Sequence, residues 1–225
     1  MNFYGVLSLI VVVGLLSVAW ARYEYRHPAS AATKTPPTIG TTWFAALGIS
    51  ACGVQQPALA ANPTAPGGFL AIPGGVIEVA PLTAAEAGNN ATLNRFVSAY
   101  PGLTVSSKEL AVPASRAHPK TPTVWKTGDT CAKGTTDAGR VGQVEIAYWK
   151  NFAAQTPQTT TDPSSVKFSP NMLISLVFAP TGTTPPKPPK SAISAMLNAT
   201  PPSTTTTTLP IATTTLHTTT TTAKH

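Results

Sequence analysis

Histidine and acidic residues are scarce in this chain, which has four histidines and eight Asp or Glu residues among 225. His27, His217 and His225 lie toward the ends, and His118 stands alone in the middle. The acidic residues are scattered, without a spacing that would place a catalytic acid beside a base. We therefore expect a non-catalytic protein with no metal site and no cofactor.

One alternative stays open, an exported enzyme whose active site lies near Glu78, Asp129 and His118 and follows no familiar pattern. Glu78 is the weak candidate residue, because it interrupts the apolar stretch 76–80. Its carboxylate either faces water or is a buried functional group, and the first interpretation is favoured because burying an unpaired charge is costly.

Basic residues are not concentrated where a nucleic-acid site would need them. The formal net charge is +7, but residues 40–180 hold nine Lys or Arg against seven Asp or Glu. A nucleic-acid-binding domain gathers its cations on the folded unit, often beside stacking aromatics. We expect no nucleic-acid partner. The cations in the flanks suit anionic lipid headgroups or an envelope polymer, although simple solvation of the flanks is the favoured interpretation.

Cysteine is nearly absent, since Cys52 and Cys131 are the only two. In an exported domain their pairing would close a loop of about 80 residues, worth up to roughly 4–5 kcal/mol in the chain-entropy model. Two inert thiols and a reactive cysteine are the alternatives. A structural disulfide is favoured, because a reactive thiol needs a nearby base.

Residues 3–21, FYGVLSLIVVVGLLSVAWA, form an apolar run without one charged residue. As a helix it would span roughly 28 Å, close to the thickness of a bilayer core. It predicts a retained transmembrane anchor in contact with membrane lipid. A cleaved signal is the alternative, with a small-residue site at 19–21 but no basic start.

Two signals disagree about which side of the membrane the rest of the chain occupies. Arg22, Arg26 and Lys34 follow the apolar run, and this bias favours a cytoplasmic location. The two cysteines, the low charge and the threonine-rich end favour export. We favour a single-pass protein of the cell membrane with an extracytoplasmic domain, and a cytoplasm-facing membrane adaptor is the alternative.

The predicted organisation is an anchor at 1–21, a linker at 22–40, a globular domain at 41–180 and a disordered Pro/Thr-rich tail at 181–225. The fold class predicted for the domain is α+β, a small mixed sheet with one amphipathic helix. The strands are expected at 43–52, 68–72, 76–80, 103–112, 141–150, 166–168 and 172–179, with loops at 54–67 and 113–126, and a short helical patch is expected at 191–198.

Local signals mark a helix and a hairpin. Leu93, Phe96, Val97 and Tyr100 recur at helical spacing within 91–100, after the capping residues Asn89 and Asn90. Between the two short apolar stretches, Pro-Gly-Gly at 73–75 predicts a tight turn rather than a phosphate-binding loop, because no lysine or dinucleotide pattern follows. The segment 166–168 is expected to pair with 172–179 across a turn at 169–171.

Parts of the sequence resemble a group of uncharacterised bacterial membrane-anchored proteins whose exported domain carries the blocks H-W-H-A-A-Y-G and H-T-H-G-D-G-x-I-H-I-H-P. The similar stretches here are T-W-F-A-A-L-G at 42–48 and G-F-L-A-I-P-G-G-V-I-E-V-A-P at 68–81, with further likeness at 88–93 and 128–131. The resemblance covers about residues 43–189.

The departures from those blocks fall on the histidines. Histidines two apart on a strand point to one face, so the family pattern implies a transition-metal site. The six positions here hold Thr42, Phe44, Leu70, Ile72, Glu78 and Ala80. Five of these side chains cannot serve as ordinary metal ligands. The resemblance therefore implies a member that keeps the scaffold and has lost the metal site.

The favoured function is binding or scaffolding at the cell envelope, with an envelope polymer or a protein as partner. Large aromatics are the side chains expected at such a contact surface, although most aromatics of this kind belong to a core. The candidates are Trp43, Phe44, Trp125, Tyr148 and Trp149.

Overall fold

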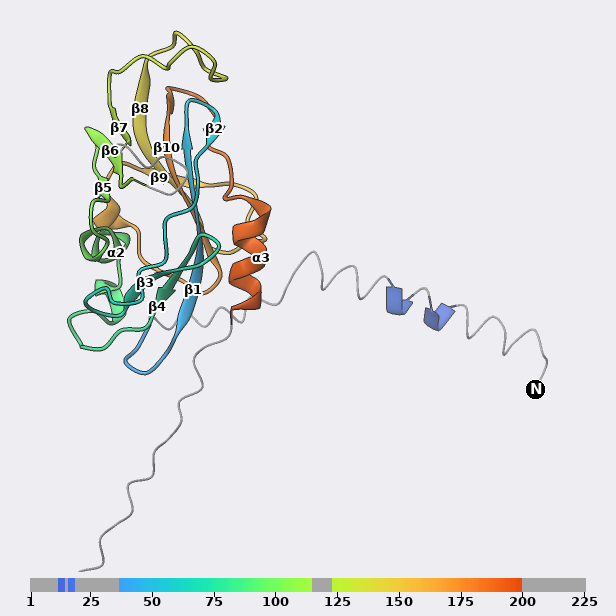
Figure 1. The fold of residues 1–225 in the computed structure, drawn as a ribbon. Coiled ribbons are helices and arrows are strands. Elements are labelled where there is room, and N and C mark those ends of the chain that lie inside the picture. Colours follow the sequence, from blue (N-terminus) through green and yellow to red (C-terminus); the bar gives the residue numbers. More distant parts are fainter. Residues whose placement is uncertain (1–11, 15, 19–36, 115–122, 200–225) are drawn as a thin grey trace, which may run out of the picture.

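The computed structural model describes residues 12–14, 16–18, 37–114 and 123–199 (Figure 1). Its strands are β1 (Trp43–Ala51), β2 (Val54–Gln55), β3 (Phe69–Ile72), β4 (Val76–Val79), β5 (Thr104–Val105), β6 (Glu109–Val112), β7 (Thr123–Lys126), β8 (Gly142–Trp149), β9 (Gln158–Thr160) and β10 (Met172–Pro180). The helices are α2 (Leu93–Ala99) and α3 (Lys190–Asn198), and short 3-10 turns form at η1 (Gly88–Asn90) and η2 (Pro163–Ser165).

The central sheet has the strand order β3-β4-β1-β10-β8-β9, with β2 also paired to β1. β1 and β10 run parallel, with Ala45 opposite Met172, and the other neighbours are antiparallel. Every residue of β10, and every residue of β1 except Trp43, is buried. These two strands are apolar almost throughout because both faces of the sheet are covered.

One face is covered by α2 and by the three-stranded sheet β5-β6-β7. Leu93, Phe96 and Val97 of α2 are buried in this core together with Leu110 of β6. The predicted α+β class and the predicted helical stripe are confirmed. The helix is shorter than expected, because Thr92 is its N-cap and the two predicted capping asparagines lie in η1 instead.

The other face is covered by the segment 181–199, which includes α3 (Figure 1). A Cβ atom added at Gly48 in β1 would lie 2.8 Å from the Cα atom of Pro188. A Cβ atom added at Gly75 would lie 3.3 Å from the Cβ atom of Ala192. The Ser175 hydroxyl donates to the carbonyl of Pro186 at 2.7 Å. Packed structure thus continues beyond position 180, the expected end of the domain, because these close approaches hold the proline-rich segment on the sheet.

Several strands differ from expectation. Residues 123–126 form β7, in a region expected to be loop, and pair with β6. The stretch expected to provide one strand at 103–112 provides two short ones, β5 and β6. The segment 166–168 does not pair with β10: Lys167 makes a single bridge to Thr92, and the amide of Leu93 donates to the carbonyl of Val166. β5 and β6 form a local hairpin within the expected strand, whereas β7 and the segment 166–168 have partners that local sequence does not specify.

The predicted anchor lies mostly outside the described residues, as do the linker up to residue 36 and the tail beyond residue 199. Residues 12–14 and 16–18 are helical. Within the described part of the chain, no helix has the length and apolar character needed to cross a membrane.

Candidate functional site

A disulfide links Cys52, which follows β1, to Cys131 in the loop before β8, as predicted. The two Cα atoms are 5.6 Å apart, the residues are separated by 79 positions, and both side chains are only 3% exposed. Cys52 and Gly53 have φ values of 51° and 76° and form the two-residue connection between β1 and β2. Two successive positive φ values are typical of a type I′ hairpin turn.

The loop that carries Cys131 is held by its own hydrogen bonds. The amide of Cys131 donates to the carbonyl of Arg140, and the amide of Gly139 donates to the carbonyl of Cys131. Arg140 also pairs with the nearly buried carboxylate of Asp137 at 2.9 Å. The disulfide therefore joins two ordered turns and fixes the loop against the end of the central sheet.

A surface hollow of about 490 Å³, open to solvent, lies beside this disulfide. Val54 and Val124 are 39% and 43% exposed there, which leaves apolar surface in contact with water. Trp125 forms part of the wall. The remaining lining residues are Ala51, Cys52, Gln56, Asp129, Thr130, Ala132 and Thr135. The hollow combines aliphatic and aromatic surface with hydroxyl, amide and carboxylate groups.

A second and much smaller cavity, with a volume of about 30 Å³, lies on another side of Trp125. Tyr100 lines it, and its hydroxyl donates to the carbonyl of Ala60 at 2.9 Å. Burial raises the pKa of Tyr100. A space of this size holds about one water molecule and is too small for a substrate.

The five predicted contact aromatics do not share one surface. Trp43 and Tyr148 pack against the core on the α2 face, whereas Phe44 and Trp149 belong to the core on the α3 face. Neighbouring positions of a strand point to opposite faces, which separates Trp43 from Phe44 and Tyr148 from Trp149. Trp125 alone lines the hollow.

The candidate acids of the enzyme alternative lie far apart. Glu78 is opposite Phe44 near the start of β1, whereas Asp129 lines the hollow next to Cys52, just past the end of β1. Eight strand residues separate these two points by roughly 26 Å. The Asp129 carboxylate accepts a hydrogen bond from the backbone amide of Lys126 at 2.8 Å and so shapes a turn. His118 lies outside the described residues.

Glu78 is half-buried in a row of side chains across three strands. It is directly opposite Phe44 on β1 and Leu70 on β3, so the three share one face of the sheet. Loss of contact with water raises the pKa of its carboxyl group. The surroundings are apolar, so the ionised form of this carboxyl group is poorly solvated.

The resemblance suggested by the sequence would place histidine at six positions, and these positions fall at one end of this face. Phe44, Leu70 and Glu78 form the row just described, and Ile72 is two residues along β3. Thr42 precedes β1 and Ala80 follows β4. Among the described residues, no three His, Cys, Asp or Glu side chains are grouped where they could hold a metal ion. The side chains present here do not fit a transition-metal site.

The hollow is the feature that sequence reasoning missed, apart from Trp125 and Asp129. Val54, Val124 and Thr135 come from three separate segments, and no spacing in the sequence connects them. The predicted disulfide was the one sequence feature that could have indicated the place of the hollow. It brings the end of the first long strand to the loop at 131. No protein-family model matches the chain, and neither the curated proteins nor the solved structures contain a significant match.

Proposed function

We propose that this chain is a non-catalytic, membrane-anchored protein of the cell envelope whose exported domain binds or scaffolds an envelope polymer or another envelope protein. The buried Cys52–Cys131 disulfide carries this proposal. Disulfides persist in oxidising compartments, and this one indicates an extracytoplasmic domain. The apolar run at 3–21 supplies the membrane anchor.

The disulfide also weighs against the adaptor alternative. A cytoplasm-facing domain would meet reducing thiols, which would leave both cysteines free. The charge bias of Arg22, Arg26 and Lys34 favours that orientation nevertheless. We rely on the disulfide more than on this charge bias, because both cysteine side chains are buried together at the end of the central sheet.

The separation of Glu78 from Asp129 means that these two candidate groups of the enzyme alternative do not share a pocket. The binding proposal instead uses the hollow beside the disulfide. Trp125 offers an aromatic surface there, and Thr130, Thr135 and Gln56 offer hydrogen-bonding groups around it. Such a mixture suits a partner with both apolar and hydroxyl or amide groups, such as a polysaccharide or a protein loop.

Cysteine accessibility in intact cells tests the location of the domain. The native chain is treated with an impermeant reductant, then with an impermeant maleimide that adds mass, before and after lysis. We expect labelling of intact cells only after reduction. Labelling only after lysis, without any reductant, would place free thiols in the cytoplasm and overturn the proposal.

Both native sulfurs are buried, so a surface reporter is needed as a matched control. Val141 is 59% exposed and lies at the same end of the domain. A chain with Cys52→Ser, Cys131→Ser and Val141→Cys should react in intact cells without reductant. Resistance of the chain to carbonate extraction of membranes tests the anchor independently.

A further inference from the structure

The end of the domain at which β1 begins exposes two large aliphatic side chains. Ile39 is 58% exposed and Leu82 is 65% exposed. Ile39 lies in a turn closed by hydrogen bonds between Thr38 and Thr41, and Leu82 lies in a loop whose amides at 82 and 83 donate to the carboxylate of Glu86. Both side chains are therefore held outward by ordered backbone.

Hydrogen bonds and strand pairing place these two turns together. The amide of Gly88, at the end of the Leu82 loop, donates to the carbonyl of Pro37 at 2.7 Å. Trp43 is opposite Val79, three residues before Leu82, and Trp43 is itself partly exposed. The apolar side chains Ile39, Trp43 and Leu82 thus mark one end of the domain, called here the β1-start end.

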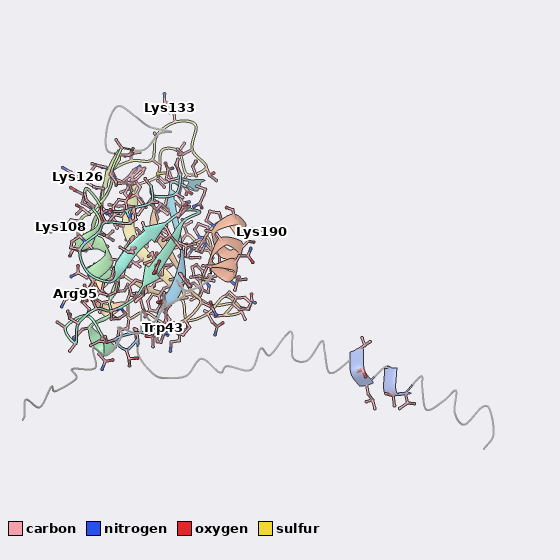
Figure 2. All side chains as sticks on the ribbon, turned by 60° about the horizontal axis from the view of Figure 1, so that its bottom comes forward. Trp43, Arg95, Lys108, Lys126, Lys133 and Lys190 are labelled. Atoms are coloured by element: carbon pink, nitrogen blue, oxygen red, sulfur yellow. A yellow bond between two sulfur atoms is a disulfide. The ribbon has the colours of Figure 1, made fainter. Side chains whose placement is uncertain are left out.

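Three exposed cations lie at the same end. Arg95 donates to the carbonyl of Ala85 in the Leu82 loop at 3.0 Å, and Lys167 donates to the side chain of Asn89 at 3.4 Å. Lys150 follows the end of β8, which lies beside the start of β10. Figure 2 shows Trp43 and Arg95 in the lower part of the domain, with Lys126 and Lys133 toward the opposite end.

The acidic groups at this end do not cancel those cations by direct pairing. Glu86 is occupied by two backbone amides, and Glu78 is half-buried beside Phe44. Within the described residues, the single ion pair joins Arg140 to Asp137, and it lies at the other end of the domain. The β1-start end therefore combines exposed aliphatic and aromatic groups with unpaired positive charge.

We infer that the β1-start end is a membrane-contacting surface that rests on anionic lipid headgroups. This inference rests on the proposed membrane anchor. The apolar run ends at 21 and the described domain begins at 37, at this same end. The fifteen residues between them can reach at most about 50 Å, which limits how far this end can lie from the bilayer. Exposed aliphatic and aromatic side chains combined with nearby cations suit the interface of an anionic membrane.

Hydrogen–deuterium exchange of the full chain in lipid nanodiscs tests this surface. One set of discs contains phosphatidylcholine with roughly one third phosphatidylglycerol, and the other contains phosphatidylcholine alone. We expect about a twofold lower deuterium uptake at 37–43 and 80–90 in the anionic discs, with no change at 129–142. Equal uptake in the two lipids at all of these segments would overturn the inference.

Matched variants separate the contribution of the exposed aliphatic side chains from that of the cations. Ile39→Ser with Leu82→Ser should abolish the protection, whereas Val141→Ser, at an equally exposed aliphatic residue of the other end, should leave it intact. Replacement of Arg95, Lys150 and Lys167 by Gln should remove the difference between the two lipids. All of these side chains are exposed, so unchanged thermal unfolding of the variants verifies that the fold persists.

Other outcomes are also decisive. Protection that depends on the number of chains per disc and not on the lipid would identify a second copy as the occupant, and would overturn the membrane surface. A chain that fails to enter the discs refutes the anchor of the proposed function. The same exchange comparison, with anionic or neutral vesicles added to the chain in solution, then tests the surface by itself.

Discussion

Gly48 of β1 lies directly beneath Pro188, so that a Cβ atom added at Gly48 would be 2.8 Å from the Cα atom of Pro188. The atom that it would meet belongs to the backbone and cannot rotate away. We predict that Gly48→Ala lowers the free energy of unfolding by about 1–3 kcal/mol through overpacking. Urea unfolding followed by tryptophan fluorescence measures this change.

The control for that prediction is the same substitution in a chain that ends at Thr184. Without the segment that contains Pro188, the added methyl group has space, and Gly48→Ala should cost no more than a few tenths of a kcal/mol. A cost of equal size in the full and the shortened chains would show that the contact with Pro188 is not its cause.

Reduction of the Cys52–Cys131 disulfide should destabilise the domain strongly. The bridge closes a loop of 79 residues, and release of that constraint lowers the free energy of unfolding by up to about 4–5 kcal/mol in the chain-entropy model. Urea unfolding with and without reductant tests this. The variant with Cys52→Ser and Cys131→Ser should resemble the reduced protein and respond to reductant no further.

Glu78 should make stability depend on pH. Its pKa in the folded state is raised from 4.5, so the folded state holds this proton more tightly than the unfolded state does. The resulting stability is present below pH 4.5 and is lost as pH rises through the folded pKa. We predict that Glu78→Gln raises Tm by about 1–2 °C at neutral pH.

The Glu78→Gln variant and the native chain should unfold at similar temperatures well below pH 4.5, where the Glu78 carboxyl is neutral in the folded and the unfolded states. Differential scanning calorimetry at acidic and at neutral pH measures the difference in Tm between the variant and the native chain. A gain in Tm that is unchanged between those conditions would mean that shape or hydrogen bonding, and not the charge, limits stability at this position.

The hollow beside the disulfide should contact the partner in cells. A photoreactive amino acid at Val124 is expected to crosslink to an envelope component several times more strongly than one at Val141, which lies outside the hollow and is more exposed. Trp125→Ala in the Val124 reporter chain should reduce the crosslink. Equal yields from Val124 and Val141 would contradict a specific site.

The elements that the sequence predicts well are those whose residues share one local pattern. The first long strand and the last are continuous apolar runs, and the helix at 93–99 shows its buried stripe directly. The hairpin turn at 73–75 is also present, because Gly74 and Gly75 have φ values of 88° and 79° that other residues avoid.

The remaining features depend on partners that local sequence does not specify. β7 contains exposed Val124 and exposed Lys126 and is a strand only because β6 offers an edge. The proline-rich segment after residue 180 packs because glycine at position 48 lets backbone meet backbone. The hollow arises where three such distant segments meet beside Cys52, so its residues cannot be collected from sequence spacing.

The parallel pairing of β1 with β10 sets the order in which this domain can form during its synthesis. Ala45 and its partner Met172 are 127 positions apart, so the middle of the sheet cannot close until nearly the whole domain has emerged. In the proposed export, the central sheet therefore cannot close until β10 has crossed the membrane. Both cysteines emerge before β10 does, and their oxidation can precede completion of the sheet.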